Sequence, residues 1–186
     1  QRIDYQGDVV IDTWIGYAWE NTKDTPQKLN FHDAQEYCQK LKIGKFKNFR
    51  LPEDYEVKNV GRIKNINFKN NSKRKFWTRS DYRNFTDGRD YYKIQSFVGN
   101  RYAWNLVSGK SYVRCVDGKK QSSSDYYKVK RIGQRQQIKK FHEQVFKKAE
   151  EENSVSAYLD VIRGYVPKSP YIEKAKKALT EIYESK

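Results

Sequence analysis

The most reactive side chains in this sequence are also the scarcest, since it has two cysteines and two histidines. Cys38 and Cys115 are too far apart for the Cys-x-x-Cys pairs of zinc and dithiol redox sites. Neither cysteine has a histidine near it in the sequence, and His32 and His142 fall in different predicted domains. A cysteine–histidine or serine–histidine–aspartate set formed only in the fold stays open, but the sequence indicates none. We therefore expect no catalytic residues and no metal site.

Carboxylates are the other groups that carry acid–base or metal chemistry. Glu53 and Glu56 lie at the start of a predicted helix, where the helix dipole favours negative charge, so acid–base catalysis is not needed to explain them. Asn84, Asp87 and Asp90 form a small group of oxygen donors, which a tight turn containing glycine explains better than a calcium site. These patterns favour a protein that is not an enzyme and that needs no cofactor.

The two cysteines lie on elements that face inward. The segment SYVRCVDG, residues 111–118, alternates as a half-buried strand does and ends in an Asp-Gly turn signal. A helix is predicted over 29–41 with Asn30 as its N-cap, and its apolar stripe includes Cys38. The strand and the helix therefore direct both sulfur atoms into one core.

The rest of the chain predicts an α+β domain followed by helices. Short antiparallel strands and one or two helices indicate a domain over residues 8–118, and the composition of 119–126 is typical of a flexible linker. Apolar residues at helical spacing predict an all-α segment over 127–186. Within the domain, strands are expected over 8–19, 76–80, 91–97, 102–106 and 111–116, and helices over 29–41 and from Pro52.

The composition permits a core but leaves a strongly basic surface. The hydrophobic fraction is 37% and the aromatic fraction 15%, so rings supply much of what the chain can bury. The formal net charge is +15, concentrated in residues 40–75 and 119–148. Such charge either favours polyanions and acidic protein faces as partners or is simply solvated surface. No apolar run approaches the length of a membrane span, so we expect no membrane-spanning segment. No signal peptide is present, so either the sequence starts after one or the protein never had one.

Four motifs occur in the order and approximate spacing of a bacterial domain family: FHDAQEYCQKL, FRLPEDYEV, FWTRSDY and YVRCVDG. Over residues 10–118 the sequence resembles the C-terminal, C-type-lectin-like domain of the Legionella collagen-like adhesin family. The resemblance implies a C-type-lectin-like fold in which Cys38 and Cys115 form a disulfide, with two buried free thiols as the alternative. A disulfide implies an oxidising compartment, hence the periplasm or the cell surface.

The helical part resembles a different kind of envelope protein. Residues 154–184, SVSAYLDVIRGYVPKSPYIEKAKKALTEIYE, are similar to the helical hairpins of bacterial envelope proteins of the tetratricopeptide type. A single hairpin cannot bury its own apolar face. It must therefore pack on the lectin-like domain, on the preceding helix or on a partner chain.

Two activities of lectin-like folds are not expected. Calcium-dependent sugar binding uses a Glu-Pro-Asn or Gln-Pro-Asp triplet and a Trp-Asn-Asp triplet, and here Leu106 replaces the acid of the second triplet. Formylglycine-generating oxidases of this fold use a pair of active-site cysteines. The implied disulfide between Cys38 and Cys115 leaves no thiols for that chemistry.

A binding surface rich in arginine and tyrosine is the remaining candidate, because these residue types dominate interface hot spots and suit sulfated or carboxylated glycans. Strand alternation turns about half of these side chains inward, so packing is the alternative explanation. A further basic stretch lies on a predicted helix over 128–140. The candidate ligand-binding residues are Arg79, Tyr82, Arg83, Arg89, Tyr92 and Arg101, with Lys73, Arg74 and Lys75 in an exposed basic loop.

These features lead to one functional hypothesis and one alternative. We expect a non-catalytic binding or scaffolding module of the bacterial cell envelope, which recognises a protein partner through its lectin-like surface and helical tail. The alternative is an adhesin that binds anionic, glycosaminoglycan-like polysaccharide without calcium. Nucleic acid is not expected as a partner, because a disulfide-bearing secreted domain argues against it.

Overall fold

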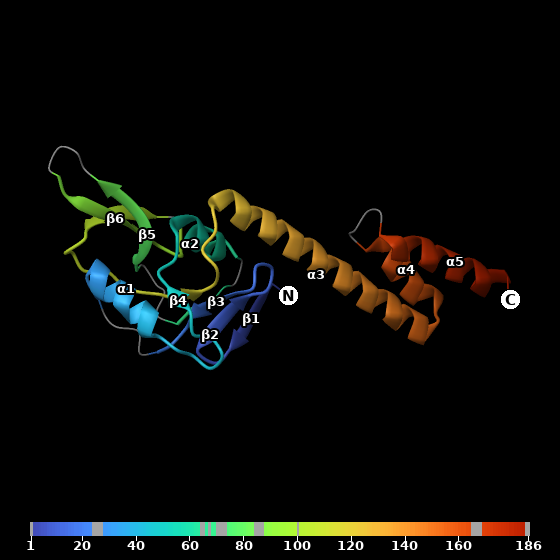
Figure 1. Cartoon of the computed structure of the whole chain (residues 1–186). Coiled ribbons are helices and arrows are strands. Elements are labelled where there is room, and N and C mark those ends of the chain that lie inside the picture. Colours follow the sequence, from blue (N-terminus) through green and yellow to red (C-terminus); the bar gives the residue numbers. More distant parts are fainter. Residues whose placement is uncertain are drawn as a thin grey trace. The chain divides into compact units, whose positions relative to one another are not determined.

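Two antiparallel sheets and five helices are present in the part of the chain that the structure, a computed structural model, describes (Figure 1). The chain divides into two units, Gln1–Tyr127 and Lys128–Lys186. The first unit is mixed α+β and the second is helical, which confirms the predicted fold class. The structure describes residues 2–23, 28–63, 66, 68–69, 74–83, 88–99, 101–164 and 169–184.

The five-stranded sheet joins the start of the first unit to its end. Its strands are β1 (Ile3–Gln6), β2 (Val9–Asp12), β3 (Tyr17–Glu20), β4 (Phe49–Arg50) and β8 (Val116–Asp117). The strand order is β1-β2-β3-β8-β4, and every neighbouring pair is antiparallel. The predicted single strand over 8–19 is wrong, because the chain turns at 13–16, where Gly16 has φ +76°.

The two helices of this unit begin with well-defined polar contacts. In α1 (Phe31–Lys40), the Asn30 Oδ1 accepts a hydrogen bond of 2.9 Å from a backbone N–H of the first turn, which confirms the predicted N-cap. At the start of α2 (Asp54–Gly61), the Arg50 guanidinium donates to both carboxylate oxygens of Glu56, at 2.7 and 2.9 Å. This ion pair ties β4 to α2, so Glu56 has a structural role.

The second sheet lies between the two helices. Its strands are β5 (Phe76–Arg83), β6 (Asp90–Gln95) and β7 (Tyr102–Leu106), in the order β5-β6-β7. One face packs on α1 through Trp77 and Ile94. Phe76, on the other face, packs in the core that α2 completes.

A disulfide joins Cys38 of α1 to Cys115, the residue before β8. Both side chains are fully buried, and their Cα atoms are 5.5 Å apart. The Glu20 carboxylate strengthens the same junction, because it accepts hydrogen bonds from the Tyr37 hydroxyl and, at 3.0 Å, from the Cys115 N–H. The implied disulfide is confirmed. The predicted closing strand is shorter than expected, since only Val116–Asp117 pair as β8.

The predicted linker over 119–126 differs from the structure, because its last four residues form the first turn of α3 (Ser123–Glu152). Tyr126 is fully buried and packs edge-to-face against Tyr17 and Tyr55. The hydroxyls of these two tyrosines donate hydrogen bonds to backbone carbonyls within the segment. Ring packing and hydrogen bonds therefore hold the segment on the first unit, although its composition is typical of a flexible linker.

The second unit consists of the remainder of α3 with α4 (Val155–Arg163) and α5 (Pro170–Glu184). Asn153, with φ +43°, ends α3, and the Ser154 Oγ caps α4 by accepting a hydrogen bond from its first turn. None of the helices in the described residues is both long enough and apolar enough to span a membrane. The buried core of the unit is formed by Phe146, Ala149, Tyr158, Val161 and Ala175.

Candidate binding surface

Two large aromatic side chains lie exposed next to each other on β7. Residues two apart on a strand share a face of the sheet, so Tyr102 and Trp104 point the same way, and they are 56% and 43% exposed. Lys93 lies opposite Trp104 on β6, with its ammonium 4.5 Å from the Tyr102 ring centroid and 5.8 Å from that of Trp104. Lys58 of α2 approaches the Tyr102 ring to 6.0 Å. We call these four side chains the aromatic–lysine platform.

Asp54, in the first turn of α2, holds both lysines of the platform. Its Oδ2 lies 2.7 Å from the Lys93 Nζ and 3.3 Å from the Lys58 Nζ. Burial would raise the pKa of the Asp54 carboxyl, but the hydrogen bond and charge of Lys93, with the charge of Lys58, hold it below its usual value. The Lys93 side chain is only 12% exposed. The platform therefore presents ring surface to solvent more than free positive charge.

The platform lies at a sheet edge, since β7 pairs only with β6 among the described strands. One side of β7 therefore carries backbone groups that no neighbouring strand of this sheet pairs. The opposite face of β7 is held in place, because Asn105 Nδ2 donates to Ser111 Oγ at 3.0 Å. Tyr91 and Leu106, a directly opposed and half-buried pair, continue the face of the platform. Flat aromatic surface beside a strand edge suits an extended partner segment.

Two of the sequence-predicted binding residues make structural contacts on the same sheet. Arg79 of β5 is partly exposed and lies 4.0 Å from a carboxylate oxygen of Glu53. Tyr92 of β6 faces away from the platform and stacks on Phe31 of α1, with ring centroids 3.4 Å apart. Burial raises the pKa of the Tyr92 hydroxyl. A ligand-binding role for Arg79 and Tyr92 stays a prediction.

Two residues of the predicted basic loop lie just before β5. The Arg74 guanidinium is 4.6 Å from the centroid of the Tyr112 ring, and the Lys28 ammonium is 5.2 Å from the same centroid. Lys75 is half-buried, and Lys73 lies outside the described residues. The structure therefore shows one cation-flanked ring at this loop, and its use in binding stays a prediction.

The remaining predicted residues are divided between the two ends of this sheet, because the starts of β5 and β7 lie at one end and the start of β6 at the other. Arg89, just before β6, and Arg101, just before β7, are both exposed. Tyr82 and Arg83 belong to β5, but their side chains lie outside the described residues. The predicted binding residues are thus distributed over β5, β6 and the segments that precede the three strands.

The platform residues themselves escaped the sequence-based prediction. A signal was present, because Tyr102 and Trp104 alternate with smaller residues in a five-residue strand. The exposure of this face follows from the edge position of β7, and Lys58 comes from a helix far away in the sequence. Neither fact is readable from local spacing.

The site contains no metal centre among the residues that the structure describes, in which no group of three or more His, Cys, Asp or Glu side chains is placed to hold an ion. What the platform provides is non-covalent chemistry: ring faces, ring edges, and cations held between rings and a carboxylate. The expectations of no cofactor and no catalytic residue stay predictions.

No known protein family matches this chain, and no curated protein sequence matches it. Among solved structures, the chain is similar to botrocetin, a C-type lectin-like snake toxin, with a TM-score of 0.40 and 11% sequence identity. The similarity covers 62% of this chain and 100% of botrocetin. At this level of similarity, no residue, ligand or partner of botrocetin is transferred to this chain. Membership of the adhesin family stays a prediction.

Proposed function

We propose that this protein is a non-catalytic binding module that recognises a protein partner through the aromatic–lysine platform, with the helical unit adding a second contact surface. The observation that carries the proposal is the pair of exposed rings on β7, Tyr102 and Trp104. Tryptophan and tyrosine are enriched among the residues that dominate interface energies. Lys93 contacts both rings, and Asp54 fixes Lys93, so the rings lose little conformational freedom on binding.

The position of the platform indicates the form of the partner. An extended segment that pairs with the free side of β7 would gain backbone hydrogen bonds there and lay alternate side chains over Tyr102 and Trp104. This mode uses the strand edge and the rings together. It requires neither calcium nor a catalytic group.

The proposed setting is the bacterial cell envelope, in the periplasm or at the cell surface. The buried disulfide between Cys38 and Cys115 supports it, because such bonds persist in oxidising compartments and are rare in the cytosol. In such a compartment the disulfide stays oxidised, and by closing a long loop of the chain it stabilises the α+β unit.

A second candidate function is calcium-independent binding of anionic polysaccharide, as in an adhesin. The observation that favours it is the Tyr112 ring flanked by the cations of Arg74 and Lys28. A sugar ring can stack on the tyrosine while its sulfate or carboxylate meets the cations. The net charge of +15 would assist the approach of a polyanion.

The test is affinity capture from a detergent extract of bacterial envelope, followed by affinity measurement with the purified captured protein. We expect Trp104→Ala to weaken that affinity about ten-fold or more. Tyr5→Ala is the matched control, because Tyr5 is an aromatic residue of β1 with a similar exposure of 44%. Affinity that is the same for both variants would contradict the role of the platform.

Salt distinguishes the two candidate functions. Affinity for a polyanion falls steeply between low and moderate salt, whereas a packed aromatic interface changes little. Capture of a polysaccharide with steep salt dependence, lost on Arg74→Glu and retained in Trp104→Ala, would replace the protein-binding proposal with the adhesin alternative.

A further inference from the structure

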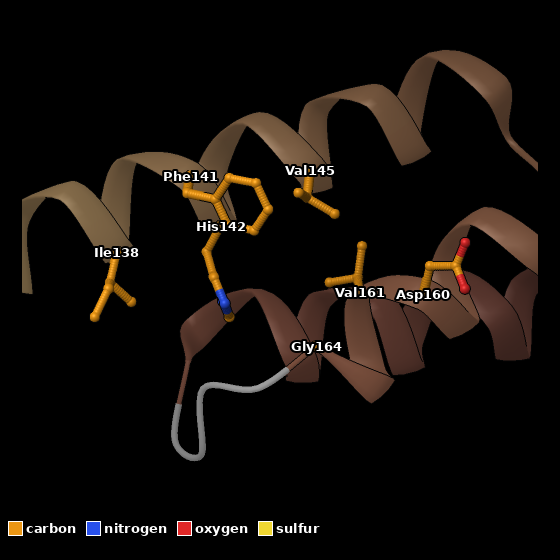
Figure 2. A pocket seen from close by; sticks show the side chains of 7 residues that line it. All are labelled: Ile138, Phe141, His142, Val145, Asp160, Val161 and Gly164. Carbon is orange, nitrogen blue, oxygen red and sulfur yellow. The ribbon is translucent and has the colours of Figure 1, made fainter. Parts of the chain in front are cut away.

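An apolar cavity of about 450 Å³ lies in the helical unit between α3 and α4 (Figure 2). Ile138, Phe141 and Val145 line it from successive turns of α3, and Val161 faces them from α4. Asp160 is the acidic side chain at its margin. The volume is within the range of pockets that hold buried ligand groups.

The lining residues belong to an apolar stripe that the unit leaves partly uncovered. Phe146 and Ala149, further along α3, are buried in the core of the unit. Ile138 and Phe141, nearer its start, are 37% and 61% exposed. Positions 138, 141 and 145 have the spacing of a helix face that packs on another helix. A large exposed phenylalanine next to a cavity marks a surface of interaction.

The cavity has cationic residues beside it on α3 and one acidic lining residue, Asp160 of α4. Residues 128–140 of α3 contain six lysines and arginines and no acid. Arg135, Lys139 and Lys140 are exposed and have no ion-pair partner within the described residues. By contrast, Lys147 of the same helix pairs with Glu143 at 3.6 Å. Within the described residues, Arg135, Lys139 and Lys140 are therefore not neutralised by ion pairs.

We propose that this cavity seats an acidic amphipathic helix of a partner protein. Apolar side chains of that helix, at i, i+3 or i+4, and i+7, fill the cavity over Ile138, Phe141 and Val145. Its carboxylates lie towards Arg135 and Lys139, which attract them during approach and fix the direction of the helix. The inference rests on the proposed function only in treating the chain as a binding module, and it names a second surface with its own partner chemistry.

Other occupants would use only part of these features. A simple polyanion would meet the cations but would gain nothing from Phe141. A lipid acyl chain or a second copy of this chain would fill the cavity without needing an acidic helix. The amphipathic helix is favoured because it uses the cavity, the exposed stripe and the unpaired cations at once.

The probe is a fluorescently labelled synthetic peptide of about 20 residues, with leucines on one helical face and glutamates on the other. Its binding to the full chain is measured by anisotropy at low and moderate salt. One control peptide has the same composition in an order that scatters the leucines, and another has lysine in place of glutamate. We expect the acidic amphipathic peptide to bind at least about ten-fold more tightly than either control.

Variants of the full chain locate the binding. Phe141→Ala should weaken binding of the acidic peptide about ten-fold or more, and the pair Arg135→Glu and Lys139→Glu should shift preference to the lysine peptide. Ile132→Ala is the matched control, because Ile132 is exposed on α3 but does not line the cavity. Unchanged circular dichroism of each variant shows that the helices persist.

Several results would overturn the inference. These are equal binding of the scattered-leucine peptide, unchanged binding by Phe141→Ala, self-association of the chain that depends on Phe141, and displacement of the peptide by a fatty acid at the same site. Trp104→Ala should leave peptide binding unchanged, since Trp104 belongs to the other unit. If Trp104→Ala leaves the affinity for the captured partner unchanged while the acidic peptide still binds as expected, the proposed function alone is contradicted. If the platform binds its partner as expected but the acidic peptide does not bind at the cavity, this inference alone is contradicted.

Discussion

Arg114 is a cation buried among aromatic rings, a setting that charged residues rarely occupy. It is 1% exposed, and its guanidinium carbon lies 4.4, 5.2 and 5.5 Å from the ring centroids of Phe68, Phe76 and Phe97. Burial lowers the pKa of Arg114 to about 10. The cost of burying the charge is offset by the ring contacts and by hydrogen bonds to backbone carbonyls.

We expect Arg114→Lys to lower the free energy of unfolding by about 2–4 kcal/mol. An ammonium cannot stack on three rings and also reach the carbonyls of Glu20 and Lys69, to which the guanidinium donates at 3.2 and 2.6 Å. Urea unfolding at neutral pH measures the difference. Arg62→Lys, an exposed control just after α2, should change stability by less than about 0.5 kcal/mol. Equal losses in the two variants would contradict a structural role for Arg114.

Asp54 gives the platform a pH dependence with a definite sign. Because its pKa in the folded protein is held below the usual 3.8, its contribution to stability is present above that pH. The contribution is lost as the pH falls through the lower folded-state value. Asp54→Asn should therefore be less stable than the wild type at neutral pH, by less than about 1 kcal/mol because the ion pairs are partly exposed. Urea unfolding at several pH values should show the gap closing below about pH 4; a gap that persists in acid would refute this assignment.

At the scale of elements, the Asn30 cap is the local signal that places the start of α1. Asn30→Ala should lower the free energy of unfolding by about 1 kcal/mol, because a backbone N–H of the first turn loses its acceptor. Asn30→Ser should lose much less, since a hydroxyl oxygen can accept the same bond from the backbone N–H without placing a second negative charge beside Asp33, to which the Asn30 amide donates at 2.7 Å. Chemical denaturation of the three proteins tests this order, and equal stability of the alanine and asparagine forms would exclude a working cap.

Elements with local signals were predictable from the sequence. The Asn30 cap and the apolar stripe that carries Cys38 predicted the start of α1 to within two residues. Both signals come from residues only three or four positions apart in the sequence, so they can be recognised without knowledge of the fold. The strand over 8–19 was overextended, because the β-branched content runs through the turn that Gly16 closes.

The candidate site depends on contacts that no local pattern contains. The platform is exposed because β7 lies at a sheet edge, and β7 lies there because the next strand along the chain, β8, pairs with β3 and β4 in the other sheet. The segment 119–126 has the composition of a linker, yet Tyr126 docks in a pocket that Tyr17 and Tyr55 form from far upstream. In both cases the outcome depends on contacts that exist only in the folded chain.

At the scale of the whole molecule, the disulfide between Cys38 and Cys115 should make a large contribution to the free energy of unfolding. Replacing both Cys38 and Cys115 by serine should lower the free energy of unfolding by about 2–5 kcal/mol, chiefly because the unfolded chain regains the freedom of a long loop. Denaturation of the wild type with and without reductant, beside the double serine variant, measures this. A variant as stable as the oxidised wild type would show that the bridge is dispensable.

The same bridge decides which part of the protein bears a mechanical load. Cys38 and Cys115 close a covalent ring that contains α2 and all three strands of the second sheet. When the two ends of the chain are pulled, tension passes through the sulfur–sulfur bond and bypasses the chain between the two cysteines, which are 77 positions apart in the sequence. The enclosed chain, about 260 Å long when fully extended, cannot be stretched until the disulfide is reduced. The aromatic–lysine platform lies inside this ring, so a partner held there is attached to a part of the protein that stretching does not unravel.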